Sequence, residues 1–211
     1  MTTLATLKSA IADDLARSDL TTQIAAAISQ AIDDYKSERL FWNETRDETF
    51  TTVAAQSTYD VDDDAAIPLF LTIDAMWIED SDSRRYALSP CDPIAMEGML
   101  DSSAASGRPY AYSYFNQSFR FYPIPDAVFT VRPMGQIEVT APSSDAETGN
   151  LWMTKAFELL RCAAKALLFI HTIKDPEQAL AMELVAQRQL AKLRRETGAR
   201  TATGTIVSTL F

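Results

Sequence analysis

The spacing of apolar residues changes twice along the chain, and this restricts the possible folds more than any other feature. Before residue 42 and after residue 151, apolar residues recur every three or four positions, which is the period of a helix lying on a core. Between about residues 48 and 141, β-branched and aromatic residues form short runs separated by polar turns, which is typical of strands. The sequence therefore predicts an α+β fold, with N- and C-terminal amphipathic helices in a bundle and an antiparallel β-rich middle region.

The N-terminal region predicts two helices. Thr2 or Thr3 can cap the first and Thr21 or Thr22 the second, because a threonine hydroxyl can accept a hydrogen bond from a free N–H of the first turn. After the β-rich region, the apolar pattern predicts one continuous helix over residues 151–173. Pro176 interrupts it, and a last helix is expected to end near Thr197, before Gly198.

The middle region contains a compact unit, "SYFNQSFRFYPIPDAVFTVRP", at residues 113–133. Its pattern predicts a strand, a tight turn at Asn116 and Gln117, and two further strands. The prolines at positions 123, 125 and 133 lack the N–H that a ladder needs, which predicts strand ends or a sheet edge there. A short helix is expected near residues 93–102, with Ile94, Met96, Met99 and Leu100 as its apolar contacts.

Charge is unevenly distributed along the chain. Residues 151–211 hold 9 Lys and Arg against 5 acidic residues, whereas residues 1–150 hold 10 against 24. An acidic body repels nucleic acid, which disfavours DNA wrapping, and a basic C-terminal segment favours an acidic partner. The apolar run at residues 156–173 contains Glu158, Arg161 and Lys165, which is unlike a membrane span, and the N-terminus lacks the pattern of a signal peptide.

The sequence contains none of the common catalytic, phosphate-binding or metal-binding motifs, and we expect no catalytic, cofactor or metal site. Asp60, Asp62 and Asp64 match the first ligands of a calcium loop, but Ala65 and Leu71 stand where glycine and glutamate are required. The single histidine, His171, has no partner for a triad and is interpreted as structural. A hydrolase using two of the 29 acidic residues remains compatible with the sequence.

Three stretches follow one another in the second half of the chain: the aromatic strand unit "RPYAYSYFNQSFRFYPIPDAVFTVRP", the acidic linker "SSDAETGN" and the helix "LWMTKAFELLRCAAKALL". With the helices around them, they resemble the head-to-tail adaptor proteins, also called connector or neck proteins, of tailed double-stranded DNA bacteriophages, most like those of short-tailed phages. The resemblance implies a structural virion protein without enzymatic activity, made in the bacterial cytoplasm and located in the neck between portal and tail. It implies a ring, usually dodecameric, beneath the portal, through which DNA passes without specific binding.

The partners implied by the resemblance are the portal protein, tail, nozzle or tail-fibre proteins and neighbouring adaptor subunits, with no membrane and no cofactor. We expect one adaptor domain over residues 1–198, with helices at about 2–42 and 151–197, a β-rich insertion at about 48–141, and an extended tail over 199–211. Fully extended, this tail reaches about 40 Å, and its "TIVSTLF" composition suits strand addition to a partner.

Two groups of residues are predicted to form interfaces. The portal-binding group is Arg194, Arg195, Arg200, Thr205, Ile206, Val207, Leu210 and Phe211. The group facing the tail or a neighbouring subunit is Tyr112, Tyr114, Phe119, Arg120 and Tyr122. The alternative interpretation is a small nucleic-acid-binding regulator that uses the basic C-terminal helix, and it predicts salt-sensitive DNA binding.

Overall fold

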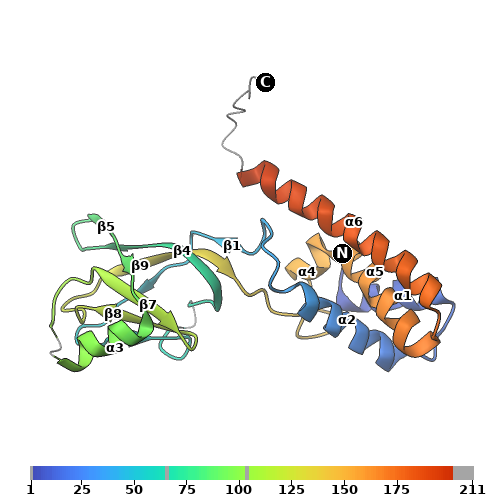
Figure 1. Ribbon diagram of the computed structural model, residues 1–211, viewed down its shortest axis with the longest axis horizontal. Coiled ribbons are helices and arrows are strands. Elements are labelled where there is room, and N and C mark those ends of the chain that lie inside the picture. Colours follow the sequence, from blue (N-terminus) through green and yellow to red (C-terminus); the bar gives the residue numbers. More distant parts are fainter. Residues whose placement is uncertain (1, 65–66, 103–104, 202–211) are drawn as a thin grey trace, which may run out of the picture. The chain divides into compact units, whose positions relative to one another are not determined.

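The computed structural model describes residues 2–64, 67–102 and 105–201 and confirms the predicted α+β class (Figure 1). The chain divides into two compact units. We call Met1–Trp42 with Val139–Phe211 the helical unit, and Asn43–Glu138 the strand-rich unit. Each unit has a hydrophobic core of its own.

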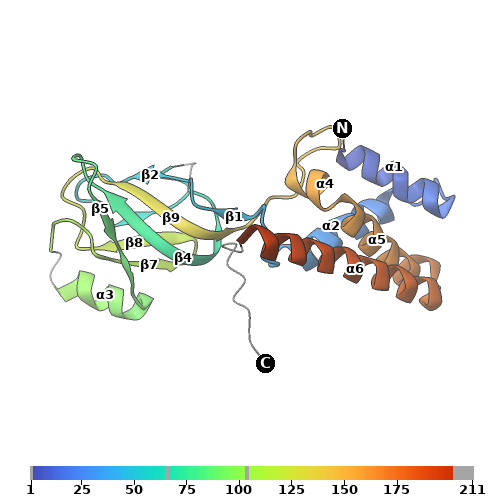
Figure 2. The ribbon, with the colours of Figure 1, turned by 90° about the horizontal axis from the view of Figure 1, so that it is seen from above.

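The helical unit is built from both ends of the chain, and α6 runs alongside α5 (Figure 2). Leu7 and Ile11 of the first helix are fully buried, and burying each stabilises the fold by about 1.5–3 kcal/mol. Thr3, one of the two threonines predicted as caps, caps this helix, and the structure adds a reciprocal capping box with Thr6. The helices are α1 (Leu4–Leu15), α2 (Thr21–Tyr35), α4 (Leu151–Lys155), α5 (Phe157–Leu168), the π-helix η1 (Phe169–Ile173) and α6 (Pro176–Thr201).

The prediction of one continuous helix over residues 151–173 is wrong. Ala156, at φ −115° and ψ 14°, separates α4 from α5, and the last turn is the π-helix η1, which ends at Lys174 in a left-handed conformation. The predicted cap of the second helix, Thr21 or Thr22, is also wrong. Leu20 occupies the cap position of α2 and forms no side-chain hydrogen bond there. Local propensity could not indicate the break at Ala156, because alanine is the best helix former.

The last helix also continues beyond the predicted stop at Gly198 and reaches Thr201. A glycine ends a helix when it adopts a positive φ, and Gly198 does not. The final turns are held by side chains instead. Arg200 pairs with Glu196 at 2.6 Å and lies over the ring of Phe41, 3.9 Å from its centroid.

The strand-rich unit contains two sheets whose inner faces enclose an aromatic core. In the described residues, the first sheet has the order β1-β9-β4-β5, with β2 also paired to β9, and the second has the order β3-β8-β7-β6. All pairs are antiparallel except β6 with β7, which is parallel. The elements are β1 (Glu44–Thr45), β2 (Phe50–Thr51), β3 (Thr58–Tyr59), β4 (Phe70–Glu79), β5 (Arg85–Ala87), β6 (Ser89–Pro90), α3 (Pro93–Ser102), β7 (Ala111–Phe115), β8 (Ser118–Tyr122) and β9 (Thr130–Ile137).

The turn predicted at Asn116 and Gln117 is confirmed, since both residues have positive φ, 49° and 63°, between β7 and β8. Of the two alternatives predicted for Pro133, a strand end or a sheet edge, the strand end is wrong, because Pro133 lies inside β9, opposite Met76. This position is compatible with proline because the other neighbours of β9 pair only at its two ends. Their partners on β9 are Thr130, Val131, Gly135 and Gln136.

In α3, Met96 is fully buried as predicted, whereas Ile94 is 82 % exposed, which corrects its assignment to the core.

The two units also differ in charge. The strand-rich unit holds 16 acidic residues against 6 arginines and no lysine, whereas the helical unit holds 13 acidic and 13 basic residues. The whole net charge of −10 therefore belongs to the strand-rich unit.

Candidate functional site

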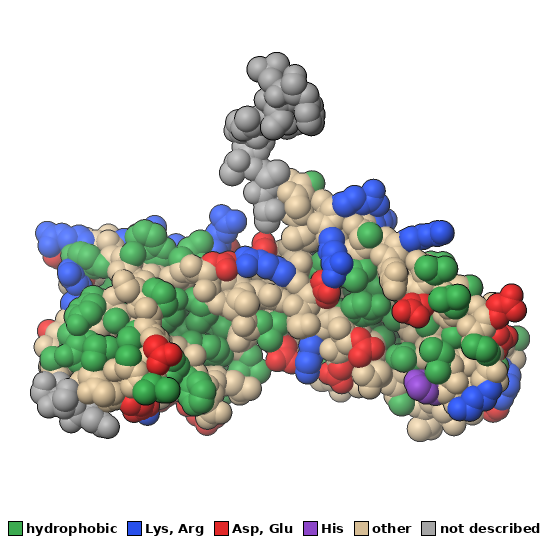
Figure 3. Space-filling view, viewed as in Figure 1, with side chains coloured by type: hydrophobic (Ala, Val, Ile, Leu, Met, Phe, Trp, Pro, Cys, Tyr) green, Lys and Arg blue, Asp and Glu red, His purple; other side chains and the backbone are tan. Residues whose placement is uncertain are grey.

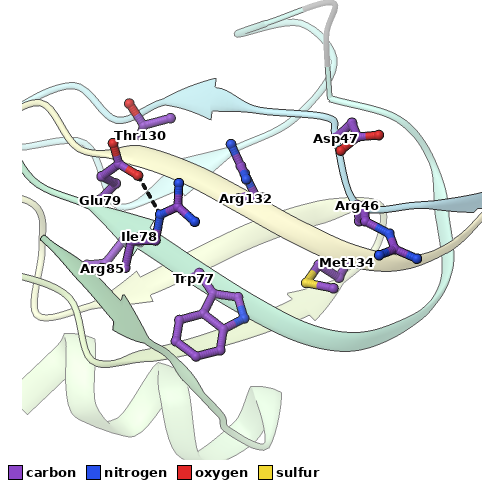
Figure 4. A pocket seen from close by; sticks show the side chains of 9 residues that line it. All are labelled: Arg46, Asp47, Trp77, Ile78, Glu79, Arg85, Thr130, Arg132 and Met134. Atoms are coloured by element: carbon purple, nitrogen blue, oxygen red, sulfur yellow. Dashed lines mark hydrogen bonds and ion pairs between the residues drawn. The ribbon is translucent and has the colours of Figure 1, made fainter. Parts of the chain in front are cut away.

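The outer face of the first sheet carries a groove of about 420 Å³ (Figure 4). It combines arginine side chains with an exposed tryptophan. We call it the arginine groove, and its lining residues are Arg46, Asp47, Trp77, Ile78, Glu79, Arg85, Thr130, Arg132 and Met134.

Strand alternation places these side chains on one face. Along β4, Met76 and Ile78 face the core, so the residues between and after them, Trp77 and Glu79, face outward. The register of β9 then sets Arg132 directly opposite Trp77. The neighbouring strand β5 adds Arg85 opposite Glu79, and the segment after β1 adds Arg46.

The charges in the groove are only partly paired. Arg85 Nε donates a hydrogen bond to Glu79 Oε2 at 2.8 Å, as the dashed line in Figure 4 marks. Neither Arg46 nor Arg132 forms an ion pair with any residue that the structure describes. Trp77, 40 % exposed, supplies an apolar surface beside these cations. Half of the arginines of an otherwise acidic unit therefore converge on one groove.

The residues predicted to face the tail or a neighbour have different environments. Tyr112 and Phe119 are buried in the aromatic core, at 5 % and 0 % exposure, and this corrects their assignment to a surface. Their alternation along β7 and β8 places them inward. Tyr114 is half-buried, and its hydroxyl accepts a hydrogen bond from Phe70 N–H at 3.1 Å. Arg120 pairs with Glu97 of α3.

The last residue of this group, Tyr122, lies edge-on to Tyr110, with ring centroids 5.7 Å apart. Sequence reasoning missed two exposed aromatic side chains of this unit: Tyr110 beside Tyr122, which is 55 % exposed, and Phe115 at the other end of β7, which is 70 % exposed. Figure 3 shows apolar side chains gathered on the face of the strand-rich unit near α3 and β7. The strand pattern could have indicated Phe115, because it directly precedes the turn.

The basic residues predicted to bind the portal lie on the last turns of α6. Arg194 donates two hydrogen bonds to Glu38, at 2.6 and 3.1 Å, so this arginine is paired within the helical unit. Arg200 is held by Glu196 and Phe41, and Arg195 Nε lies 3.4 Å from the carbonyl of Ala191. The remaining members, Thr205, Ile206, Val207, Leu210 and Phe211, lie outside the described residues.

In the described part of the chain, no three His, Cys, Asp or Glu side chains are grouped so that they could hold a metal ion. The carboxylate of Asp60 instead accepts the N–H of Asp62 at 2.9 Å within its own loop. His171 lies in η1, at the end of the α5 segment. Among the helices of the described ranges, none is both long and apolar enough to cross a membrane.

Surfaces that combine arginine with exposed aromatic residues are typical of proteins that work by binding other proteins. Within that class, the family is shown by sequence comparison: the family model described as SU10 adaptor protein matches residues 2–208. The chain belongs to the SU10 adaptor protein family, and this membership makes it a structural adaptor of the phage head–tail junction, a component of the virion neck. A comparison with curated proteins gives no match.

Proposed function

We propose that the protein forms a ring beneath the portal, connects the capsid to the tail and lets genomic DNA pass through its centre. The observation that carries the proposal is the family match over residues 2–208, which spans both units. Tailed-phage adaptors of the kind that the sequence resembles form such rings, usually of twelve subunits. The short-tailed subtype, synthesis in the host cytoplasm and a purely structural, cofactor-free role belong to the same proposal.

We assign portal binding to the end of α6 and the segment that follows it. Arg195 makes only a long contact with its own helix, so its charge is available to a partner. Twelve such segments acting together would convert weak individual contacts into stable attachment, because binding of one raises the effective concentration of the others. Tail and neighbour contacts are assigned to the strand-rich unit, where Tyr114, Arg120 and Tyr122 are partly accessible.

The acidic strand-rich unit supports passage of DNA without binding. With 16 carboxylates against 6 arginines, it repels phosphates over about one Debye length, roughly 8 Å at physiological salt. Specific DNA binding would need a basic surface that contacts several phosphates.

The test is assembly on the portal ring of the same phage. The full chain and a variant ending at Thr201, which keeps all of α6, are mixed with purified portal, and stoichiometry is measured by electron microscopy and mass determination. We expect a defined number of full-length chains per portal and loss of binding on truncation. The matched control is Ile206→Val, which keeps the segment and its apolar character.

A full chain that does not bind the portal would contradict the adaptor-ring proposal. Binding to DNA that weakens steeply with salt would then favour the regulator. Binding by both chain lengths would keep the ring but move the portal contact from residues 202–211 to the part of the helical unit that ends at Thr201.

A further inference from the structure

We propose that, in the ring, the arginine groove of one subunit binds the acidic loop at residues 60–64 of the neighbouring copy. The inference rests on the proposed ring and names the contact between its subunits. The loop reads Asp-Val-Asp-Asp-Asp and is the densest acidic stretch of the sequence. The groove holds half of the positive charges of the same unit.

The groove can bind carboxylates strongly. Arg46 and Arg132 have no ion-pair partner among the described residues, and a guanidinium stays charged at any pH of interest. Its planar donors can bind both oxygens of a carboxylate, which makes such pairs stronger than those of neutral groups. Figure 4 shows Arg132 between Arg46 and the Glu79–Arg85 pair, so the positive charges are distributed along the sheet.

The acidic loop has complementary properties. Asp62 and Asp63 are exposed, and Val61 is 51 % exposed, so the loop offers an apolar side chain between carboxylates. Two internal hydrogen bonds order it: Asp62 N–H to Asp60 Oδ1 at 2.9 Å, and Asp60 N–H to Asp63 Oδ2 at 3.1 Å. A preordered loop loses less conformational entropy on binding. Val61 would contact the exposed indole of Trp77.

The two features lie on different surfaces of the strand-rich unit. The groove crosses the outer face of the first sheet, whereas the loop follows β3, the edge strand of the second sheet. The edges formed by β5 and β6 are adjacent because only Leu88 separates these strands. The Tyr59 hydroxyl, bonded to the backbone of Val53, places β3 near β2, on the side away from that edge. A contact between different surfaces of identical subunits forms a ring when the rotation from one copy to the next closes, as the proposed ring requires.

Charge explains why such a contact is needed. Adjacent strand-rich units, each with 10 more acidic than basic residues, repel one another. Placing the acidic loop of one copy on the arginine groove of the next, where three arginines outnumber the carboxylates of Asp47 and Glu79, replaces part of this repulsion with attraction. It also fixes the orientation of the neighbours, because any other pairing of these surfaces brings like charges together.

Charge reversal tests the contact. The variants are Arg132→Glu in the groove, Asp62→Arg in the loop, and both together in one chain. Arg84→Glu is the control, since its side chain is 70 % exposed, it makes the same charge change and it does not line the groove. The adaptor concentration for half-saturation of the portal ring is measured by mass determination, at low and high salt. Thermal unfolding of each free variant verifies folding.

We expect each single reversal to raise the half-saturating concentration by about tenfold or more, because like charges then face each other. The half-saturating concentration of the double variant should return to within about threefold of the wild-type value, because every interface regains one attractive pair. The control should stay within about twofold, as an exposed charge away from an interface contributes little.

The outcomes separate this inference from the proposed function. Wild-type chains that form no ring would contradict the ring itself, whatever the variants do. A wild-type ring that both single reversals leave unchanged would contradict the groove–loop contact alone. Impaired single variants without rescue in the double variant would also overturn it, since the two residues would then act at separate places.

Discussion

At the scale of single residues, Gly135 in β9 is the position where the fold tolerates no side chain. A Cβ there would lie 2.1 Å from the carbonyl oxygen of Thr72 and 2.9 Å from Cα of Ile73, both backbone atoms of β4. The strands approach closely because β4 shifts register on both sides of this point. We expect Gly135→Ala to lower the free energy of unfolding by more than about 3 kcal/mol, measured by denaturant titration.

The matched control is Gly98→Ala in α3, where an added Cβ meets no atom within 4 Å. Alanine favours a helix over glycine by about 0.5–1 kcal/mol, so this change should leave stability unchanged or raise it. Equal decreases in the free energy of unfolding for the two variants would contradict the view that the close approach of the β4 backbone excludes a side chain at Gly135.

Two buried tryptophans of the helical unit provide a second comparison. Trp152 Nε1 donates to the carbonyl of Val139 at 2.9 Å, whereas Trp42 Nε1 is buried without a partner among the described residues. Their rings pack edge to face, 5.9 Å apart, and both are buried. Trp152→Phe should therefore lower the free energy of unfolding by about 1–3 kcal/mol more than Trp42→Phe does, because only the change at Trp152 leaves the carbonyl of Val139 without its hydrogen bond. Thermal unfolding of the two variants, side by side, measures the difference, and equal losses would show that the hydrogen bond contributes nothing.

At the level of elements, one carboxylate of α1 forms the ion pairs that link this helix to α5. Arg161 donates to both oxygens of Asp14, at 2.7 and 2.8 Å, and Lys165 Nζ lies 2.8 Å from Oδ2. The hydrogen bonds from Arg161, followed by those from Lys165, lower the pKa of Asp14 from 3.8 to about 2, against an opposing effect of burial. Because the folded pKa lies below the unfolded one, this stabilisation is complete above about pH 4 and is lost as the pH falls toward 2.

We expect Asp14→Asn to lower stability at pH 7 by about 1 kcal/mol, a value reduced for solvent screening of a partly exposed pair. The loss should shrink as the pH is lowered from 4 to 2, where the wild type also loses its carboxylate charge. Asp13→Asn, an exposed neighbour on the same helix, is the control. Unfolding measured across pH would contradict the assignment if the difference between Asp14→Asn and wild type were the same at pH 2 and pH 7.

Elements specified by adjacent residues could be predicted from sequence. The Thr3 cap and the Asn116–Gln117 turn depend on side chains or φ values within a few positions, and both are confirmed. The break at Ala156 could not be predicted, because no local residue disfavours a helix there. The exposure of Ile94 depends on which face of α3 meets the sheet, and the weak apolar period of that helix does not specify this.

The arginine groove was not predicted for a related reason. Its cations come from three separated segments, at Arg46, Arg85 and Arg132, and only the cross-strand register brings them together. The portal-binding and tail-side residues were proposed from resemblance and composition. Neither of these indicates whether a side chain is exposed, and a residue must be exposed to form an interface. Tyr112 and Phe119 fail that condition because strand alternation turns them inward.

At the scale of the whole molecule, the chain forms its helical unit from both ends and its strand-rich unit from the middle. The two hydrophobic cores share no residue within the described ranges. We therefore expect two unfolding transitions in calorimetry of the full chain, because cooperativity follows a shared core. Asp14→Asn should lower only one melting temperature and Gly135→Ala only the other. For a unit of about 100 residues, each kcal/mol lost lowers Tm by about 4–8 °C.

The same experiment relates stability to assembly. The contact proposed between subunits involves only the strand-rich unit, so ring formation should raise the melting temperature of the transition that Gly135→Ala lowers, since ligands stabilise the state that they bind. Portal binding through α6 should instead raise the melting temperature of the transition that Asp14→Asn lowers. A single transition displaced equally by both variants would mean that the two units unfold together, and the assignment of portal and neighbour contacts to separate units would then have to be made by binding measurements alone.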